Sequence, residues 1–134
     1  MTNILAGDNS DFEGGTKGSW GSWGNSSSTN VSAKEEGYKS DYCVVLVNPS
    51  DGDDYYAAQF AYTFNEPLAV GETYIIQFYA KSTINSSGVQ FASQNSNDYS
   101  GEGYHAFTLS TDWTLCEYEY TCTKENIDRI LINF

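Results

Sequence analysis

The segment YYAAQFAYTFN, residues 55–65, decides the fold. At the two-residue period of a β-strand, one alternate set of side chains is apolar and predicts a core face. That set is Tyr56, Ala58, Phe60, Tyr62 and Phe64, and the other is Tyr55, Ala57, Gln59, Ala61 and Thr63. The second set carries no charge. A flat, uncharged and partly apolar surface suits a sugar ring, so the segment predicts a strand with one packing face and one binding face.

Three later segments, residues 88–94, 104–109 and 129–134, have the same alternation. Each places apolar side chains on one face and neutral polar or small side chains on the other. The polar candidates on these faces are Gln90, Gln94, Tyr104 and Asn133. They could be the ordinary outward faces of a sandwich, but such faces are usually rich in lysine and glutamate. Four uncharged faces in one chain favour a binding surface.

Length and charge limit the class of protein. The 134 residues suit one domain, residues 1–134, with a core of its own. Six basic and 18 acidic residues give a formal charge of −12. This field repels phosphates, so nucleic acid and anionic membranes are poor partners. Neutral glycans and a bound cation are compatible with it.

The targeting and cysteine patterns are less informative. No segment approaches the roughly 20 apolar residues of a membrane span, and the first residues lack the basic and apolar regions of a signal peptide. Cys43, Cys116 and Cys122 lack the spacing of a zinc or redox site. One bridge from Cys43 and three buried thiols are both compatible with the sequence.

Seven or eight short strands at regular spacing, with almost no helical periodicity, predict an all-β fold. We expect an antiparallel β-sandwich, a jelly roll. Residues 14–29 are expected to form a loop, with one of Trp20 and Trp23 in the core and the other at a surface. The apolar run 42–47 predicts a strand buried on both faces, and residues 124–128 predict one turn of helix.

The order of several motifs resembles the carbohydrate-binding modules of the family 4, 9 and 22 group. These motifs are NILAGDNSDFEGG, SWGN, CVVLVNPSDGDDYYAAQF, LAVGETYIIQFYAKS, FTLSTDW and RILINF. Such modules are attached to xylanases and other glucanases. The resemblance implies a jelly roll with a concave binding cleft. It also implies non-catalytic binding of xylan or mixed-linkage β-glucan by a monomeric module of a larger, secreted or cell-surface enzyme.

The resemblance also implies site residues. An aromatic residue before a WxxQ-like segment stacks on the sugar in such modules, and YAAQ places Tyr56 there, with Gln59 as its partner. The strand period instead favours Tyr55, so both remain candidates. A second stacking residue is expected between Gln94 and Tyr104, at Tyr99 or Tyr104 itself. Trp23 matches a loop position that reaches the cleft rim, whereas Trp20 is expected in the core.

A structural calcium ion away from the cleft is a further expectation from the resemblance. Its candidate ligands are Glu13, Glu36 and Asp41, and oxygen ligands in an acidic chain suit Ca²⁺. The calcium site of such modules also uses an aspartate on a final strand that follows an INFG-like segment. The sequence stops at Phe134 and does not include a counterpart of this aspartate. The loop carboxylates Asp51, Asp53 and Asp54 are more typical of a solvated turn.

Two other functions remain open. Glu117 and Glu119 could be the paired carboxylates of a small glycoside hydrolase, although residues i and i+2 of one strand point the same way at about 7 Å. His105 has no triad spacing around it, so packing or a place at the cleft edge suits it better than catalysis. The neutral face could also be a protein interface of an adhesive sandwich domain.

Overall fold

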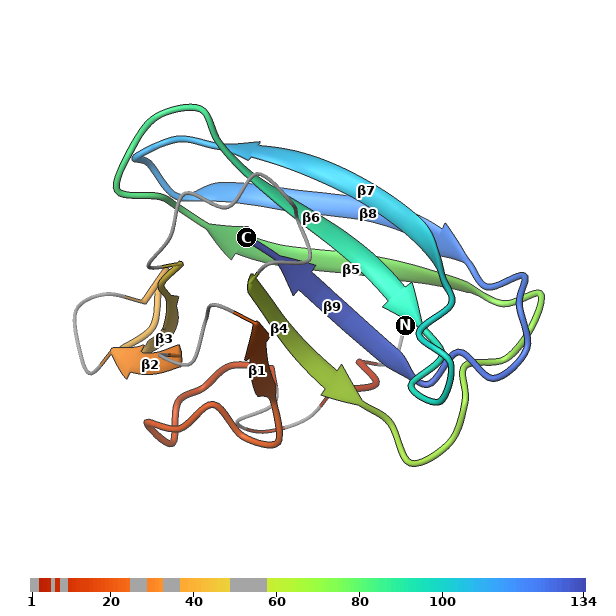
Figure 1. Cartoon of the computed structure of the whole chain (residues 1–134). Coiled ribbons are helices and arrows are strands. Elements are labelled where there is room, and N and C mark those ends of the chain that lie inside the picture. The colour runs from red at the N-terminus through yellow and green to blue at the C-terminus, as the bar shows by residue number, and fades with distance from the viewer. Residues whose placement is uncertain (1–2, 6, 8–9, 25–28, 33–36, 49–57) are drawn as a thin grey trace.

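The predicted fold class is confirmed, because the protein is an antiparallel β-sandwich (Figure 1). The computed structural model describes residues 3–5, 7, 10–24, 29–32, 37–48 and 58–134. These residues contain no α-helix, so the expected helical turn at residues 124–128 was wrong. None of their segments is a helix long and apolar enough to cross a bilayer.

Nine strands are described, all paired antiparallel. They are β1 (Gly21–Gly24), β2 (Thr29–Ser32), β3 (Cys43–Leu46), β4 (Ala58–Thr63), β5 (Thr73–Ala80), β6 (Ser87–Gln94), β7 (Gly101–Leu109), β8 (Thr114–Thr121) and β9 (Arg129–Asn133).

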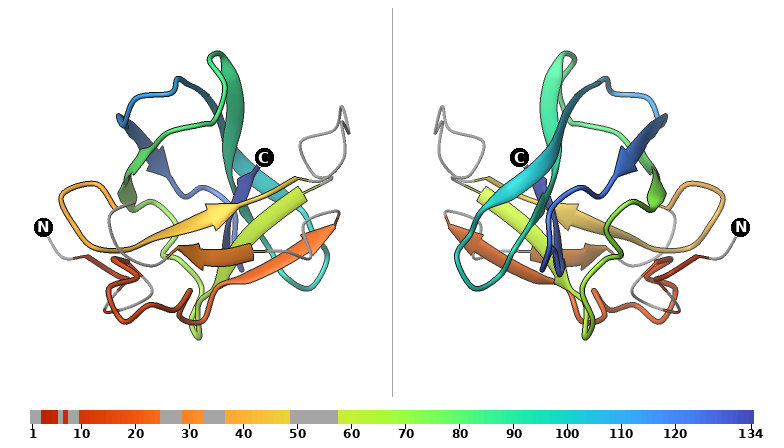
Figure 2. Two further views of the ribbon diagram at one scale, coloured as in Figure 1. Left: turned by 90° about the vertical axis from the view of Figure 1, so that its left-hand side faces the viewer. Right: turned by 90° about the vertical axis from the view of Figure 1, so that its right-hand side faces the viewer.

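The strands form one large and two small sheets. The five-stranded sheet has the order β1-β4-β9-β6-β7, and β5 pairs with β8 while β2 pairs with β3. Seen from the side, the β5–β8 pair lies on one side of the molecule and β6 and β7 on the other (Figure 2). The core therefore lies between the β5–β8 pair and one face of the five-stranded sheet.

Aromatic side chains join the two layers. Phe78 of β5 meets Phe107 of β7 edge to face at 5.5 Å between ring centroids. The rings of His105 and Tyr118 stack at 4.3 Å, so the only histidine has the packing contact that its sequence context favoured. Strand β5 alternates half-buried and exposed residues, as its two-residue period predicts. The other face of the five-stranded sheet points away from β5 and β8.

The N-terminal third differs from the sequence-based expectations. Trp20 is buried and stacks on Phe60 at 4.5 Å, which confirms its core position. Trp23 was expected in a loop but belongs to β1, which pairs with β4. Residues 42–47 were expected to be buried on both faces, yet Val45 and Val47 are exposed.

The three cysteines form no disulfide, and burial raises the pKa of the Cys116 and Cys122 thiols.

A carboxylate fastens the start of β7 to the segment after β8. Glu102 Oε1 accepts hydrogen bonds from the Tyr120 hydroxyl at 2.7 Å and the Thr123 amide at 2.8 Å, and its Oε2 accepts one from the Thr123 hydroxyl. Ser93 Oγ lies 2.8 Å from the Glu102 carbonyl oxygen, to which it donates, and 2.9 Å from the Tyr120 hydroxyl. A register shift between Phe91 and Ser93 sits at this contact. We call it the Glu102 clamp.

The Glu102 clamp makes stability depend on pH. Burial opposes ionisation of Glu102, but the hydrogen bonds from Thr123 and Tyr120 outweigh it and lower the pKa to about 2. Since the folded pKa is below the unfolded one, the stabilisation is present above about pH 4.5 and disappears as the pH falls toward 2.

We therefore expect Glu102→Gln to lower the free energy of unfolding at neutral pH by about 1 kcal/mol, since the site is partly solvated. The difference from the parent should shrink as the pH approaches 2. Urea unfolding across this pH range measures both quantities. Glu119→Gln, on the exposed face of β8, is the matched control. A Glu102→Gln deficit that does not change with pH would contradict the assigned pKa.

Candidate functional site

The outward face of the five-stranded sheet carries three rows of side chains across β4, β9 and β6. Backbone register places their members side by side. The rows are Gln59–Asn133–Gln90, Ala61–Leu131–Ala92 and Thr63–Arg129–Gln94. Alternate residues of a strand are about 7 Å apart, so the two outer rows are polar and flank an apolar row between them. We call these nine residues the floor.

The first row is a continuous chain of amides. Gln59 Nε2 donates to Asn133 Oδ1 at 3.1 Å, and Asn133 Nδ2 donates to Gln90 Oε1 at 3.1 Å. Asn133 is 3% exposed and holds the two glutamines in fixed orientations. Each glutamine keeps one amide group outside these bonds, Oε1 of Gln59 and Nε2 of Gln90. The row is thus rigid and still presents an acceptor and a donor.

The third row contains a charged side chain. Arg129 Nε donates to Thr63 Oγ1 at 3.0 Å, and Arg129 Nη1 donates to Gln94 Oε1 at 3.2 Å. Arg129 Cζ also lies 4.7 Å from the ring centroid of Trp23. Between the outer rows, Ala61, Ala92 and Leu131 form a small buried apolar cluster. The two alanines are small, so the middle row projects less than the glutamines and Arg129 on either side of it.

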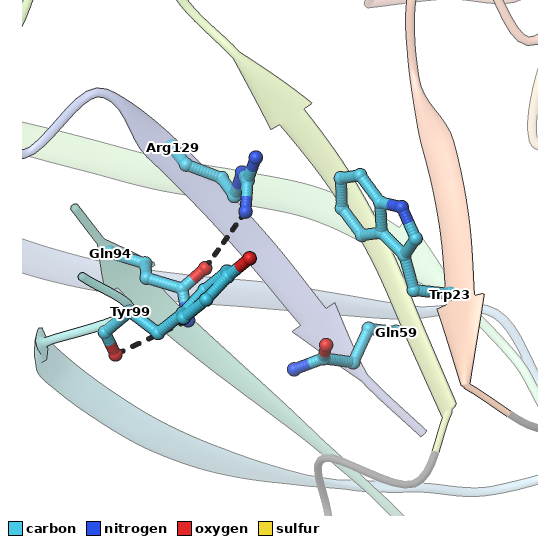
Figure 3. A pocket seen from close by; sticks show the side chains of 5 residues that line it. All are labelled: Trp23, Gln59, Gln94, Tyr99 and Arg129. Atoms are coloured by element: carbon cyan, nitrogen blue, oxygen red, sulfur yellow. Dashed lines mark hydrogen bonds between the residues drawn. The ribbon is translucent and has the colours of Figure 1, made fainter. Parts of the chain in front are cut away.

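Two aromatic side chains stand at either side of the floor (Figure 3). Trp23 of β1 is paired with Gln59 and is 41% exposed, and its indole lies against Gly21, where a Cβ would be 3.4 Å from the ring. Tyr99, in the loop between β6 and β7, is 69% exposed. With Gln59, Gln94 and Arg129 they line a pocket of about 270 Å³. Such a volume is slightly below the ~300–1,000 Å³ of closed small-molecule pockets.

Tyr104 lies at the β7 edge of the same face. The register pairs Gly101 with Gln94, and a Cβ on Gly101 would stand 2.5 Å from the Tyr104 hydroxyl. The missing side chain at Gly101 therefore leaves the space that the Tyr104 ring uses. Tyr104 is exposed, so it extends the surface beyond Gln94.

Sequence comparison identifies the family. A family model described as "Carbohydrate binding domain" (CBM_4_9) matches residues 7–134. The chain belongs to this family of carbohydrate-binding domains. A comparison with curated proteins finds no match.

Solved structures of such modules share the fold. "CBM4 structure and function" superposes with a TM-score of 0.62 at 22% identity, over 85% of this chain and 74% of that chain. "BiXyn10A CBM1 APO" gives 0.54 at 14%, covering 84% of each chain. The CBM22-1-GH10 modules of Clostridium thermocellum endo-1,4-beta-D-xylanase 10B, complexed with xylohexaose, give 0.58 at 15%. That match covers 94% of this chain and 24% of the xylanase chain.

Most residues predicted from the sequence lie on one surface of this carbohydrate-binding domain. Trp23, Gln59, Gln94 and Tyr99 line the pocket. Gln90 and Asn133 belong to the amide row, and Tyr104 lies at the β7 edge of the surface, beyond Gln94. Tyr55 and Tyr56 lie outside the described residues. The choice between them stays a prediction.

Arg129 was missed by the sequence reasoning, which expected an uncharged face. That expectation was wrong at this position. The signal was available, because the two-residue period that places Leu131 and Asn133 outward also places Arg129 there. The sequence analysis takes Asn133 from that face and leaves out Arg129, the first residue of the strand.

The candidate calcium ligands are only partly described. Glu13 accepts hydrogen bonds from the backbone amides of Asp41 at 3.4 Å and Tyr42 at 3.2 Å. Two of the three candidate ligand residues, Glu13 and Asp41, are therefore in contact. Glu36 lies outside the described residues, as do Asp51, Asp53 and Asp54. Within the part of the chain that is described, no three His, Cys, Asp or Glu side chains form a metal-binding group. Calcium binding therefore stays a prediction.

Asn133 is expected to determine the geometry of the amide row. Asn133→Ala removes the bridge between Gln59 and Gln90 and leaves both to water, so the free energy of unfolding should fall by about 1–2 kcal/mol. Chemical denaturation measures this loss. Thr108→Ala, an exposed position on β7, is the control and should stay within about 0.5 kcal/mol of the parent. Equal stability of the two variants would show that the row is not held by Asn133.

Proposed function

We propose that the protein binds a single β-glycan chain along the floor, without catalysis. The observation that carries this proposal is the pair of exposed aromatic residues, Trp23 and Tyr99, which line one pocket together with Gln59, Gln94 and Arg129. Membership of a carbohydrate-binding family supports it. The ligand class we favour is xylan, with mixed-linkage β-glucan as the alternative.

Each part of the site has a physical role in such binding. The indole of Trp23 and the ring of Tyr99 offer apolar faces to the C–H groups of a pyranose. The amide groups of Gln59 and Gln90 that remain outside the row can accept from and donate to sugar hydroxyls. Ala61 and Ala92 are buried beneath these groups and support them.

The expected affinity is modest. An open, wet groove buries little of its ligand, so we expect a dissociation constant of roughly 1 mM to 1 μM, or about −4 to −8 kcal/mol. The fixed amide row reduces the ordering cost of binding. A modest affinity suits a module that holds an attached enzyme near its polysaccharide. We propose this role, in a secreted or cell-surface glycoside hydrolase with a monomeric module.

Xylan preference has one indirect support. The structurally similar Clostridium thermocellum modules are described in complex with xylohexaose. Xylose has no hydroxymethyl arm, so it requires less width above the floor than glucose. Titration with xylohexaose and with a mixed-linkage β-glucan hexasaccharide would separate the two ligands.

No observation favours the alternative functions. Glu117 and Glu119 are exposed on β8, in the layer opposite the floor, and Glu117 accepts a hydrogen bond from Gln77 at 2.7 Å. They share one strand face instead of flanking a groove, unlike the carboxylates of a glycosidase. A protein-binding role would show itself as self-association without glycan binding.

The aromatic residues supply the first test. Trp23→Ala and Tyr99→Ala should each weaken xylohexaose binding about 10-fold, because each removes one stacking surface. Isothermal titration calorimetry measures the change, and thermal unfolding checks the fold. Tyr79→Ala is the matched control, since Tyr79 is an exposed tyrosine on β5 that stacks on Tyr38 at 3.9 Å. Unchanged affinity in both site variants would reject this site.

Calcium forms a separate proposal that rests on the meeting of Glu13 with residues 41–42. If Ca²⁺ binds there, a concentration 100 times its dissociation constant stabilises the fold by about 2.7 kcal/mol. Thermal unfolding with excess Ca²⁺ and with a chelator measures this shift. It should disappear in Glu13→Gln and persist in Glu119→Gln. An identical melting temperature with and without Ca²⁺ would rule out the site.

A further inference from the structure

Among the residues that the structure describes, Arg129 is the single charged side chain that lines the pocket. Its described partners are all neutral: the Thr63 hydroxyl, the Gln94 amide and the Trp23 ring. The carboxylate next to it in sequence, Asp128, is engaged elsewhere, since it accepts from Ser96 N at 2.8 Å and Ser96 Oγ at 2.6 Å. The floor thus holds a cation whose charge these contacts do not neutralise.

The guanidinium is held in a fixed position. Hydrogen bonds on two sides and the indole of Trp23 restrict it, while five N–H donors are available in total and two are used in these bonds. The remaining donors form a planar fork, which matches the two oxygens of a carboxylate better than a single hydroxyl. A fixed fork needs little ordering when a ligand carboxylate arrives.

The charge of the whole chain argues against a general attraction for anions. With a formal charge of −12, the protein repels an anionic polymer at long range. Salt limits this repulsion to about 8 Å at physiological ionic strength. Arg129 acts at contact distance inside the pocket. Its attraction for a single carboxylate is therefore opposed only weakly by the screened repulsion from the rest of the chain. The surface therefore suits a sparsely charged glycan, not a dense polyanion.

From these observations we propose that the site prefers a glycan that carries a hexuronic acid, whose carboxylate pairs with Arg129. This inference rests on the proposed glycan binding at the same floor. The amide row is about 13 Å from the Arg129 row along the strands. Neutral sugar units lie over Gln59 and Gln90, and the acidic unit lies at the Gln94 end, between Trp23 and Tyr99.

The test uses a matched pair of ligands. One is a xylo-oligosaccharide with a glucuronic acid branch, and the other is the same compound with its carboxyl group reduced to a hydroxymethyl group. Calorimetry at physiological ionic strength, where the long-range repulsion is screened, should show about 10-fold tighter binding of the acidic compound. Added salt should reduce this preference. An oligogalacturonide in a third titration distinguishes a uronic acid branch from a uronic acid main chain.

Variants assign the preference to Arg129. Arg129→Gln should bind the acidic and reduced ligands equally, and Arg129→Lys should keep part of the preference, because it retains the charge but not the fork. Lys81→Gln removes a positive charge at Trp113, after β5, and should keep the full preference. The two Arg129 variants together keep the test decisive if one of them disturbs Trp23.

The outcomes separate this inference from the proposed function. Equal binding of the acidic and reduced ligands by the parent protein overturns the role of Arg129 and leaves glycan binding intact. Binding of neither ligand overturns both. A preference that survives in Arg129→Gln also overturns the inference, because the carboxylate would then be recognised elsewhere.

Discussion

The register of β4, β9 and β6 is the constraint on which both the core and the site depend. Side chains alternate between the faces of a sheet, so a slip of one residue would exchange the two sets completely. Phe60, Ile132 and Phe91 share one row on the inner face, while Gln59, Asn133 and Gln90 share one on the outer face. The inner row favours this register by burial, and the outer row favours it through its amide bonds. Neither face can change its pairing without the other.

The walls of the site have a different origin from its floor. Trp23 comes from a four-residue edge strand, and Tyr99 comes from a loop in which it has a positive φ of 62°. Both are far more exposed than Asn133. The loop is anchored by the amide of Tyr99, which donates to the Asn95 carbonyl at 2.8 Å. The Glu102 clamp fixes the start of β7 directly after it. The site therefore combines a floor that is rigid before binding with walls that can adjust to a ligand.

The sequence predicted the floor better than the walls, for physical reasons. A two-residue period is a local property, so Gln59, Gln90, Gln94 and Asn133 could be placed on outward faces from their own segments. The order β4-β9-β6 depends on contacts between segments far apart in the chain, which no local pattern contains. Trp23 was predicted in a loop because glycine and serine disfavour strands, but backbone pairing with β4 overrides that preference. Tyr55, Tyr56 and Glu36 remain predictions, since the structure does not describe them.

The bonded state of the floor determines which groups can give selectivity. The amides of the first row are already hydrogen-bonded to one another. A sugar hydroxyl that binds Gln59 or Gln90 would therefore only replace water, while each glutamine keeps its hydrogen bond to Asn133. Such an exchange changes the free energy little, about 0.5–1.5 kcal/mol per hydrogen bond. In the proposed complex, stacking on Trp23 and Tyr99 would then supply most of the affinity, and stacking discriminates poorly between sugars of similar shape. The charge of Arg129 is different in kind, because its present partners orient it without neutralising it. Of the groups on this surface, it is the one at which a single change in ligand chemistry alters affinity most.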